Sequence, residues 1–170
     1  MVTVRHTAQL SADELAAVRA LCDASYDEFG DADWEHALGG MHALVVEDGV
    51  LVAHGAVVQR RLLHRGRSLR CGYVEAVAVH PDHRGRGHGN RVMSALEDLA
   101  PAYDLLALCS SREGRPLYES RGWALWRGDT SALTPDGLRQ TPDEDSIYVL
   151  GGTVDLDAPL ACDWREGDLW

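Results

Sequence analysis

The chain has 170 residues, 45% of them hydrophobic, and this length is enough for one hydrophobic core, so we expect a single domain over residues 1–170. All 16 basic residues are arginine, which excludes enzymes that need a central lysine, such as Schiff-base enzymes and Walker-type nucleotidases. The net charge of -11 argues against a general nucleic-acid-binding protein, because such binding neutralises many phosphates.

The first third of the chain predicts a short strand, two helices and a β-hairpin. Residues 2–6 are extended, and Ser11 and Glu14 in "SADE" form a capping box ahead of apolar residues at helical spacing. A second, short helix is expected around "DADWEHAL", with Asp31 or Asp33 as its cap. "MHALVVE" and "VLVAHGAVVQRRL" then indicate two strands that are joined by a turn at "DG".

The rest of the chain alternates strands with helices. After a turn near "HRGR", "SLRCGYVEAVAV" extends the hairpin to a three-stranded antiparallel meander. A helix over about residues 89–100, a strand at "LLALCS", a helix in "REGRPLYESRGW" and a β-rich end follow. This order predicts an α/β (α+β) fold with a mixed, mostly antiparallel central sheet flanked by helices.

The cysteines and the apolar runs predict a cytoplasmic protein. The four cysteines lie far apart, without the paired spacing of a zinc site, and we expect separate buried thiols. The chain shows no charged-then-apolar leader and no apolar run of the ~20 residues that a membrane span needs. We therefore expect neither a disulfide framework nor a membrane partner.

Charge is unevenly distributed along the sequence. Residues 60–91 hold eight arginines and two acids, a balance of +6, whereas the remainder holds eight arginines and 25 acids, a balance of -17. Single charges are mostly solvated, but the asymmetry as a whole suits an anionic ligand in the middle segment and a polycation at the flanks.

The segment "VHPDHRGRGHGN" (residues 79–90) predicts a phosphate-binding loop. Its glycines allow the backbone to approach a ligand, and the following helix N-terminus offers unpaired N–H groups to an anion. Arg84 and Arg86 add charge. His80, His83 and His88 lack the spacing of a metal motif, so we expect solvated loop histidines and no metal. Little aromatic interleaving argues against nucleic acid as a partner.

The loop and a second motif resemble the GNAT superfamily of N-acyltransferases. Arg84, Gly87 and Gly89 give "R-x-x-G-x-G" between a strand and a helix, and "RPLYESRGW" is similar to the "LYxxxGF" pattern of that family. The resemblance implies acetyl-CoA as co-substrate, without a metal. It implies cofactor contacts from the end of the strand and from the loop: Val77, Ala78, Val79, Arg84, Gly85, Arg86, Gly87, His88, Gly89 and Asn90.

The same resemblance assigns three catalytic roles. An amine must lose a proton before it attacks the thioester, so the reaction needs a base. Glu75 is the only carboxylate in its strand, and we expect it to be the general base. A free glutamate is too weak a base, so burial must raise its pKa or a water must relay the proton. The family places an oxyanion donor near Val77. Tyr118 is implied as the general acid for the leaving thiolate, although a core aromatic at that position is an open alternative.

Longer stretches resemble the aminoglycoside 2'-N-acetyltransferases. They are "DWEHALGGMHALV", "QRRLLHRG", "LRCGYVEAVAV", "YESRGW", "TPDED" and "CDWREGDLW". This resemblance implies acetylation of the 2'-amine of aminoglycosides, which confers antibiotic resistance, and a possible homodimer. Acid-rich segments at residues 11–35 and 141–170, each with eight acids and one arginine, suit a polycationic drug.

We expect substrate contacts from the portions that match this family: Asp33, Glu75, Cys109, Ser110, Glu144, Asp168 and Trp170, with Glu28 as a weaker candidate. Trp164 and Trp170 either anchor the end of the chain or pin it so that the Trp170 carboxylate reaches the site. Cys109 stands where relatives often have serine, and Glu144 is longer than the expected aspartate. The alternatives are a GNAT enzyme for another polyamine or metabolite amine, and a non-catalytic protein that binds CoA or the drug.

Overall fold

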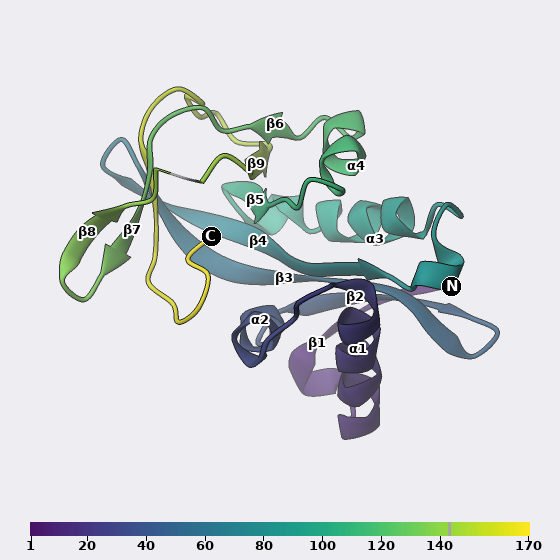
Figure 1. Ribbon diagram of the computed structural model, residues 1–170. Coiled ribbons are helices and arrows are strands. Elements are labelled where there is room, and N and C mark those ends of the chain that lie inside the picture. Colours follow the sequence, from purple (N-terminus) through teal and green to yellow (C-terminus); the bar gives the residue numbers. More distant parts are fainter. Residues whose placement is uncertain (143) are drawn as a thin grey trace. The chain divides into compact units, whose positions relative to one another are not determined.

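The computed structural model describes residues 1–142 and 144–170. Three short 3-10 turns accompany the regular elements, at Thr7–Gln9, Pro81–His83 and Ala100–Ala102. The helices and strands of Figure 1 are β1 (Val2–His6), α1 (Ala12–Ser25), α2 (Asp31–Ala37), β2 (Met41–Glu47), β3 (Val50–His64), β4 (Arg67–Val79), α3 (His88–Glu97), β5 (Leu105–Cys109), α4 (Arg115–Ser120), β6 (Ala124–Leu125), β7 (Thr130–Thr134), β8 (Gly137–Gln140), β9 (Ile147–Leu150) and β10 (Leu160–Cys162).

The chain divides into two compact units. Unit 1 consists of Met1–Val58 and Val74–Leu99, and unit 2 consists of Gln59–Tyr73 and Ala100–Trp170. The long strands β3 and β4 each contribute one half to each unit. The expectation of a single domain over the whole chain stays a prediction.

Unit 1 is built on antiparallel strands. β1 pairs with β2, and β2 pairs with the first half of β3 from Met41↔Val57 onward. The "DG" turn is confirmed, because Asp48 and Gly49 adopt left-handed φ values of 50° and 82°. In this unit α1 and α2 lie on one face of the strands and α3 lies on the other (Figure 1).

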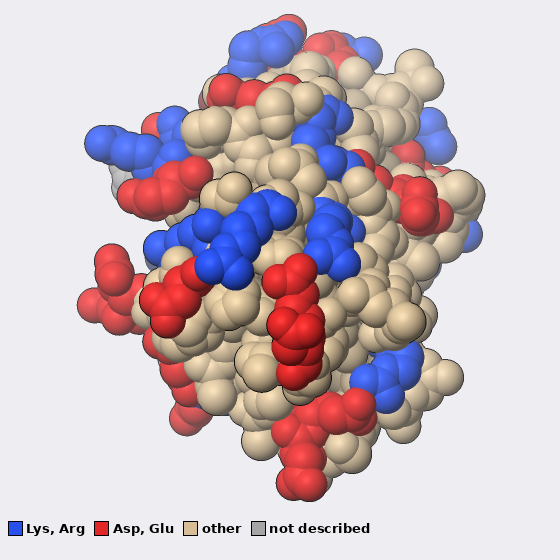
Figure 2. Space-filling model, turned by 90° about the vertical axis from the view of Figure 1, so that its right-hand side faces the viewer, with Lys and Arg blue, Asp and Glu red and all other residues tan. Residues whose placement is uncertain are grey.

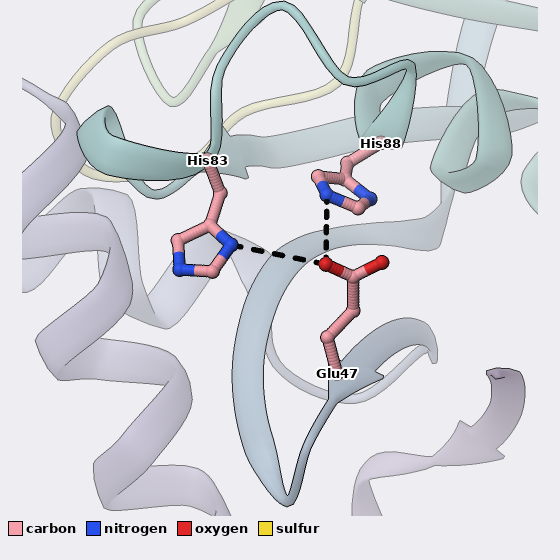
Figure 3. Close-up of side chains that lie close together, drawn as sticks. All are labelled: Glu47, His83 and His88. Atoms are coloured by element: carbon pink, nitrogen blue, oxygen red, sulfur yellow. Dashed lines mark ion pairs between the residues drawn. The ribbon is translucent and has the colours of Figure 1, made fainter.

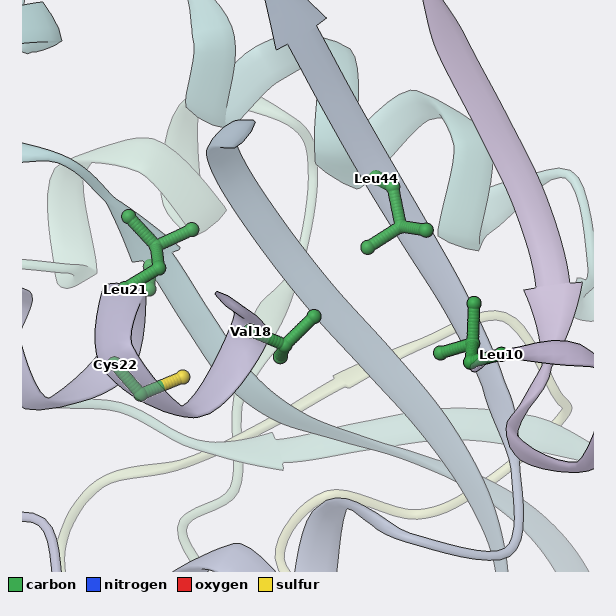
Figure 4. Close-up of a cluster of buried hydrophobic side chains, with 6 residues drawn as sticks. Leu10, Val18, Leu21, Cys22 and Leu44 are labelled. Carbon is green, nitrogen blue, oxygen red and sulfur yellow. The ribbon is translucent and has the colours of Figure 1, made fainter. Parts of the chain in front are cut away.

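The core beneath α1 follows the predicted apolar face of that helix. Six buried side chains form a cluster between α1 and the strands (Figure 4): Leu10, Val18, Leu21, Cys22, Leu44 and Ala78. Full burial of a side chain the size of leucine stabilises the fold by about 1.5–3 kcal/mol. The predicted capping box is confirmed as well, with Ser11 N donating to Glu14 Oε2 at 2.9 Å and Glu14 N donating to Ser11 Oγ at 3.2 Å.

On the opposite face of unit 1, α3 packs closely on the strands. A Cβ atom at Gly55 of β3 would lie 2.7 Å from Val92 Cγ1, so only glycine allows this approach. Val92, Met93 and Leu96 are buried. The helix ends at Glu97, a few residues before the predicted end near residue 100, and a 3-10 turn that contains Pro101 follows.

Unit 2 mixes parallel and antiparallel pairs. β4 runs parallel to β5 over Cys71–Tyr73, and β9 pairs antiparallel with both β5 and β6. The second half of β3 pairs antiparallel with β10, which runs parallel to β7, and β7 pairs with β8. The prediction of a mixed, mostly antiparallel sheet flanked by helices is confirmed.

The structure describes all four cysteines, and none of them is in a disulfide, as predicted. Cys22, Cys71 and Cys162 are buried, but the prediction of a buried thiol is wrong for Cys109, which is exposed at the end of β5. Among the described residues, no helix combines the length and the apolar character that would let it cross a membrane.

Candidate active site

The predicted phosphate loop has the backbone of an anion site. Gly85 and Gly87 have φ values of 75° and 80°, which are left-handed conformations that favour glycine. Gly87 is the N-cap of α3, and Gly89 lies in the first turn of that helix. The first amides of a ten-residue helix therefore follow directly on two exposed glycines, an arrangement that accepts a phosphate group.

The two loop arginines contact backbone carbonyls of unit 1. One guanidinium nitrogen of Arg84 donates to the carbonyl of Ser25 at 2.9 Å, and its Nε donates to the carbonyl of Val79 at 3.3 Å. Arg86 donates to the carbonyl of Asp82 at 3.2 Å. Arg84 thus braces the loop against the end of α1, in addition to any role toward a phosphate.

The loop histidines meet an acidic residue from β2 (Figure 3). His88 Nε2 and His83 Nδ1 lie 3.4 and 3.9 Å from the same carboxylate oxygen of Glu47. The expectation of solvated loop histidines is wrong for His88, whose side chain is only 2% exposed. Because the ring is buried, the predicted cofactor contact of His88 requires its backbone and stays a prediction.

The Glu47, His83 and His88 cluster resembles the donor set of a metal site, but Arg91 opposes that interpretation. The three ligand atoms lie within 4.8 Å of one another. A guanidinium nitrogen of Arg91 lies 3.3 Å from both Glu47 Oε1 and His88 Nδ1. Because arginine only donates, Nδ1 is the acceptor and the ring proton sits on Nε2, the atom that a metal would require. We interpret the cluster as an ion pair between Arg91 and Glu47, with the two histidine rings packed beside the carboxylate, which ties β2 to α3 and the loop before it.

Ionic pairing of this kind extends over the surface. On the face shown in Figure 2, arginine side chains lie next to acidic ones instead of forming a separate basic surface. Within the arginine-rich segment, Arg91 pairs with Glu47 and Arg70 pairs with Asp104. Part of the predicted local excess of positive charge is therefore neutralised by neighbouring acids.

The end of β4 carries the predicted base and the predicted oxyanion donor. Glu75 is partly buried, and Ala76, which follows it, has a left-handed φ of 49° inside the strand. The carbonyl of Val77 accepts a hydrogen bond from the Tyr26 hydroxyl at 2.7 Å. The carbonyl of Ala76 accepts one from the ring of His54 at 2.9 Å. Side chains therefore hold the carbonyl of the left-handed residue itself and the carbonyl of the residue that follows it.

His54 belongs to a buried chain of polar groups that the sequence did not predict. His42 Nδ1 lies 2.9 Å from His54 Nε2, and His42 Nε2 lies 2.7 Å from the hydroxyl of Thr7. Neither ring is exposed. Burial lowers the pKa of His42 to about 4 and that of His54 to about 3, so both rings are neutral at pH 7.

Tyr118, the predicted general acid, lies in α4 and is buried. Its ring packs at 6.0 Å from the ring of Trp123 and 6.4 Å from that of Tyr148, measured between centroids. Burial, followed by the neighbouring Cys109, raises the pKa of Tyr118 to about 12. The phenol consequently holds its proton at neutral pH, as a proton donor must.

Two predicted substrate residues meet near the end of β5. Cys109 Sγ lies 3.5 Å from Glu144 Oε1, and the same oxygen accepts a hydrogen bond from Ser146 N at 3.1 Å. Ser110 is buried, and its hydroxyl donates to the carbonyl of Ser111 at 2.7 Å. Residue 143 of the "TPDED" motif lies outside the described residues.

The end of the chain is held by two arginines. Trp170 is buried, its indole N–H donates to Thr141 Oγ1 at 3.0 Å, and its backbone oxygen accepts from Arg165 at 2.8 Å. Arg60 donates to the carbonyl of Leu169 at 2.8 Å. Trp164, in contrast, is 43% exposed, so of the two tryptophans only Trp170 is buried, and the predicted contact of its carboxylate with the substrate stays a prediction.

The remaining acidic candidates differ in what they contact. Asp33 accepts a hydrogen bond from Gly30 N at 2.7 Å and so caps α2, which confirms the sequence prediction of Asp31 or Asp33 as the cap of this helix. Glu28 and Asp168 are exposed. The backbone oxygen of Asp168 accepts from Arg165 Nε at 2.6 Å. These acidic residues belong to different units, and each is described only within its own unit. The predicted substrate contacts therefore stay predictions.

Comparisons with known proteins give the family. Residues 6–126 match the model of the acetyltransferase (GNAT) domain. An aminoglycoside 2'-N-acetyltransferase of Mycolicibacterium fortuitum is 49% identical over 174 residues, which cover 97% of this chain and 89% of that protein. Both resemblances seen in the sequence are thereby confirmed.

Solved structures support the fold. A GNAT family acetyltransferase from Brucella melitensis in complex with acetyl-CoA has a TM-score of 0.63 at 16% identity, over 98% of this chain and 97% of that chain. A GCN5-related N-acetyltransferase from Kribbella flavida has a TM-score of 0.61 at 17% identity, over 75% of this chain. The match covers 34% of that larger chain. The protein is therefore an acetyltransferase that belongs to the GNAT superfamily and, within it, to the aminoglycoside 2'-N-acetyltransferases.

Proposed function

We propose that this protein transfers the acetyl group of acetyl-CoA to the 2'-amine of aminoglycoside antibiotics and thereby confers resistance to them. The observation that carries the proposal is the 49% identity, over nearly the whole chain, with an aminoglycoside 2'-N-acetyltransferase. The acid-rich segments at residues 11–35 and 141–170 support a polycationic substrate.

The loop between β4 and α3 fits the pyrophosphate of CoA. Gly85 and Gly87 adopt left-handed conformations and have no side chains, so a pyrophosphate can approach the first backbone amides of α3. Arg86 adds positive charge beside these amides. When bound, acetyl-CoA supplies the acetyl group as a reactive thioester. The backbone of Val77, Ala78 and Val79 is proposed to align its pantetheine arm.

Glu75 is proposed as the general base. It takes the proton that the substrate nitrogen loses on forming its bond to the acetyl carbon, directly or through one water. The N–H of Val77 donates to the acetyl oxygen as that oxygen gains negative charge.

Tyr118 is proposed as the general acid. Its buried hydroxyl donates the proton that the departing sulfur needs once the carbon–sulfur bond breaks. The pKa of about 12 keeps the proton on Tyr118 until that moment. The amine becomes an acetamide, and CoA leaves as the free thiol. The proton on Glu75 then returns through solvent to the phenolate of Tyr118, which restores both side chains.

Substrate binding is assigned to acidic side chains and to the end of the chain. Glu144 beside Cys109 offers a carboxylate to an ammonium group of the drug. Asp33, Ser110, Asp168 and Trp170 are proposed as further contacts. A cytoplasmic location and a homodimer stay predictions.

A thiol-release assay with mapped products tests the proposal. Purified protein with acetyl-CoA should release thiol when tobramycin is added, and the product should carry its acetyl group on the 2'-nitrogen. A matched aminoglycoside with a hydroxyl at the 2' position should give no turnover. Binding of drug or CoA without thiol release would favour a non-catalytic binding protein, and a much higher kcat/KM for another amine would favour a different substrate.

The role of Glu75 is tested separately. Glu75→Gln should lower kcat while acetyl-CoA still binds, because the amide keeps the shape of the side chain but accepts no proton. An equal loss of kcat and of cofactor binding would indicate a structural role instead. Asp82→Asn, an exposed carboxylate nearby in the loop, is the matched control.

A further inference from the structure

A chain of hydrogen bonds runs through the core of unit 1 and ends beside the proposed base. It passes from Thr7 to His42, from His42 to His54, and from His54 to the carbonyl of Ala76, over distances of 2.7, 2.9 and 2.9 Å. Leucine at either histidine position would fill a strand core without polar atoms that need partners. The presence of His42 and His54 at these positions therefore indicates a role in addition to core packing.

The direction of every bond in the chain follows from its last member. A carbonyl oxygen only accepts, so His54 carries its proton on Nδ1 and its Nε2 must accept from His42 Nδ1. A neutral His42 then accepts at Nε2 from the hydroxyl of Thr7. Gly39 N donates to the Thr7 oxygen at 2.9 Å. The carbonyl of Gly40 lies 3.2 Å from the same oxygen but already accepts from the backbone N–H of Thr7 at 2.9 Å, so the hydroxyl proton is assigned to the shorter contact with His42. Each ring has one tautomer that satisfies both of its neighbours.

The carbonyl at the end of the chain belongs to a strained residue. Ala76 has a φ of 49° inside β4, a left-handed conformation that an alanine adopts at a cost comparable to the net gain from one hydrogen bond. The bond from His54 is therefore large enough to offset this cost, beside the bond that Tyr26 makes to the next carbonyl. Strained residues of this kind cluster at functional sites, where a strand irregularity re-aims its neighbours.

We propose, on the basis of the proposed function, that His54 is a positioning residue for acetyl transfer. Its hydrogen bond to the carbonyl of Ala76 fixes the backbone between Glu75 and Val77. His42 and Thr7 hold the tautomer that this bond needs. The loss of the bond frees Ala76 to return to an extended conformation, which turns the side chain of Glu75 and the N–H of Val77 away from the substrate. The effect falls on the chemical step more than on cofactor affinity, because no member of the chain lies in the loop proposed to bind the pyrophosphate of the cofactor, and the Tyr26 bond to Val77 still holds the backbone proposed to align the pantetheine arm.

Two amide variants separate this role from simple packing. In His54→Asn the amide nitrogen lies close to the position of Nδ1 and can still donate to Ala76, whereas in His54→Gln it reaches toward the position of Nε2 and cannot. His64→Gln is the matched control, since His64 is also buried on β3 and its Nδ1 lies 3.2 Å from a carbonyl, that of Pro159 in unit 2.

The expected result is a split between kcat and KM. His54→Gln should lower kcat about 10- to 100-fold, the loss expected for a small misplacement of catalytic groups, with KM for acetyl-CoA almost unchanged. His54→Asn should retain kcat close to that of the wild type even where its thermal midpoint falls. His64→Gln should lower the midpoint alone. Equal kcat values in the two His54 variants would overturn the proposal.

A measurement on the unmodified protein covers the case in which neither variant folds. Nitrogen-15 NMR of the histidine rings should show His54 protonated on Nδ1, with slow exchange of that proton. Protonation on Nε2 would contradict the proposal. A wild type without aminoglycoside turnover would contradict the proposed function, whereas turnover that is insensitive to the choice of amide at His54 would contradict this inference alone.

Discussion

The guanidinium of Arg60 lies against the carboxylate of Asp163, with 2.8 Å between Nε and Oδ1, although 103 residues separate them in the sequence. Arg60 is nearly fully buried on β3, and its charge also lies 4.7 Å from the centre of the Tyr73 ring. A second nitrogen of Arg60 donates to the carbonyls of Asp163 and Leu169. One side chain thus joins strand β3 to the segment that follows β10.

Arg60→Met should destabilise the protein strongly. The change removes three hydrogen bonds to partners that are partly buried, so the free energy of unfolding should fall by about 2–4 kcal/mol in urea titrations. Residues 164–170 should also become accessible to proteases. Arg127→Met is the matched control, because Arg127 pairs with Asp157 by two bonds of 2.7 Å on an exposed surface, where water and salt screen the ion pair and little stability should be lost. Equal losses in the two variants would contradict this assignment.

The buried histidines predict a loss of stability in acid. The pKa of His54 falls from 6.5 to about 3 on folding, and that of His42 to about 4. The unfolded chain therefore binds more protons below pH 6.5, and stability is complete above that value and decreases as the pH falls toward 4. Each pH unit in this window costs up to about 1.4 kcal/mol per histidine.

Urea titrations between pH 4.5 and 7.5 measure this dependence. The slope of the unfolding free energy against pH should be smaller in His54→Asn than in the wild type, by the contribution of about one bound proton. Identical slopes in the wild type and His54→Asn would mean that His54 is protonated in the folded state.

Tyr118→Phe should slow the reaction without unfolding the protein. The ring contacts with Trp123 and Tyr148 survive, so the thermal midpoint should hold, while loss of the proton donor should lower kcat about 10²- to 10⁴-fold. Tyr148→Phe is the control, because its hydroxyl donates to Glu119 at 2.7 Å and has no proposed part in transfer. Full activity of Tyr118→Phe would leave Tyr118 as a core aromatic only.

Glu144→Gln should weaken drug binding more than it slows turnover. The amide oxygen can keep the hydrogen bond from Ser146 N, so the variant removes the charge with little change in the local structure. Loss of one charged contact should raise KM for tobramycin about 10- to 100-fold. Asp145→Asn, at an exposed neighbour that pairs with Arg115, should change KM little. Equal KM values in the two variants would exclude Glu144 from the binding site.

Local features of the fold were predictable because their causes lie within a few residues. The capping box of Ser11 and Glu14 and the turn at Asp48 and Gly49 each depend on neighbours in the sequence, and both are confirmed. The end of α3 was predicted less well, because the last turn of a helix depends on packing as well as on the proline beyond it.

Long-range polar contacts were not predictable in the same way. Nothing near His88 in the sequence indicates that Glu47 will lie beside it, and nothing near His42 indicates His54 as its partner. Such pairs are fixed by strand register and by helix packing, which single-sequence patterns do not encode. Glu75 and Tyr118 came from resemblance to a family, and kinetics must establish their roles.

The exposure of Cys109 affects thiol assays and cysteine labelling of this protein. The three other cysteines are buried, and burial raises the pKa of Cys22 to about 12 and that of Cys162 above its usual value, so their thiolates are scarce at neutral pH. A disulfide reagent used to detect CoA will therefore consume about one equivalent of enzyme thiol before any product forms. The same selectivity allows a maleimide dye to be attached at Cys109 alone, where its fluorescence would report changes around Glu144 in real time.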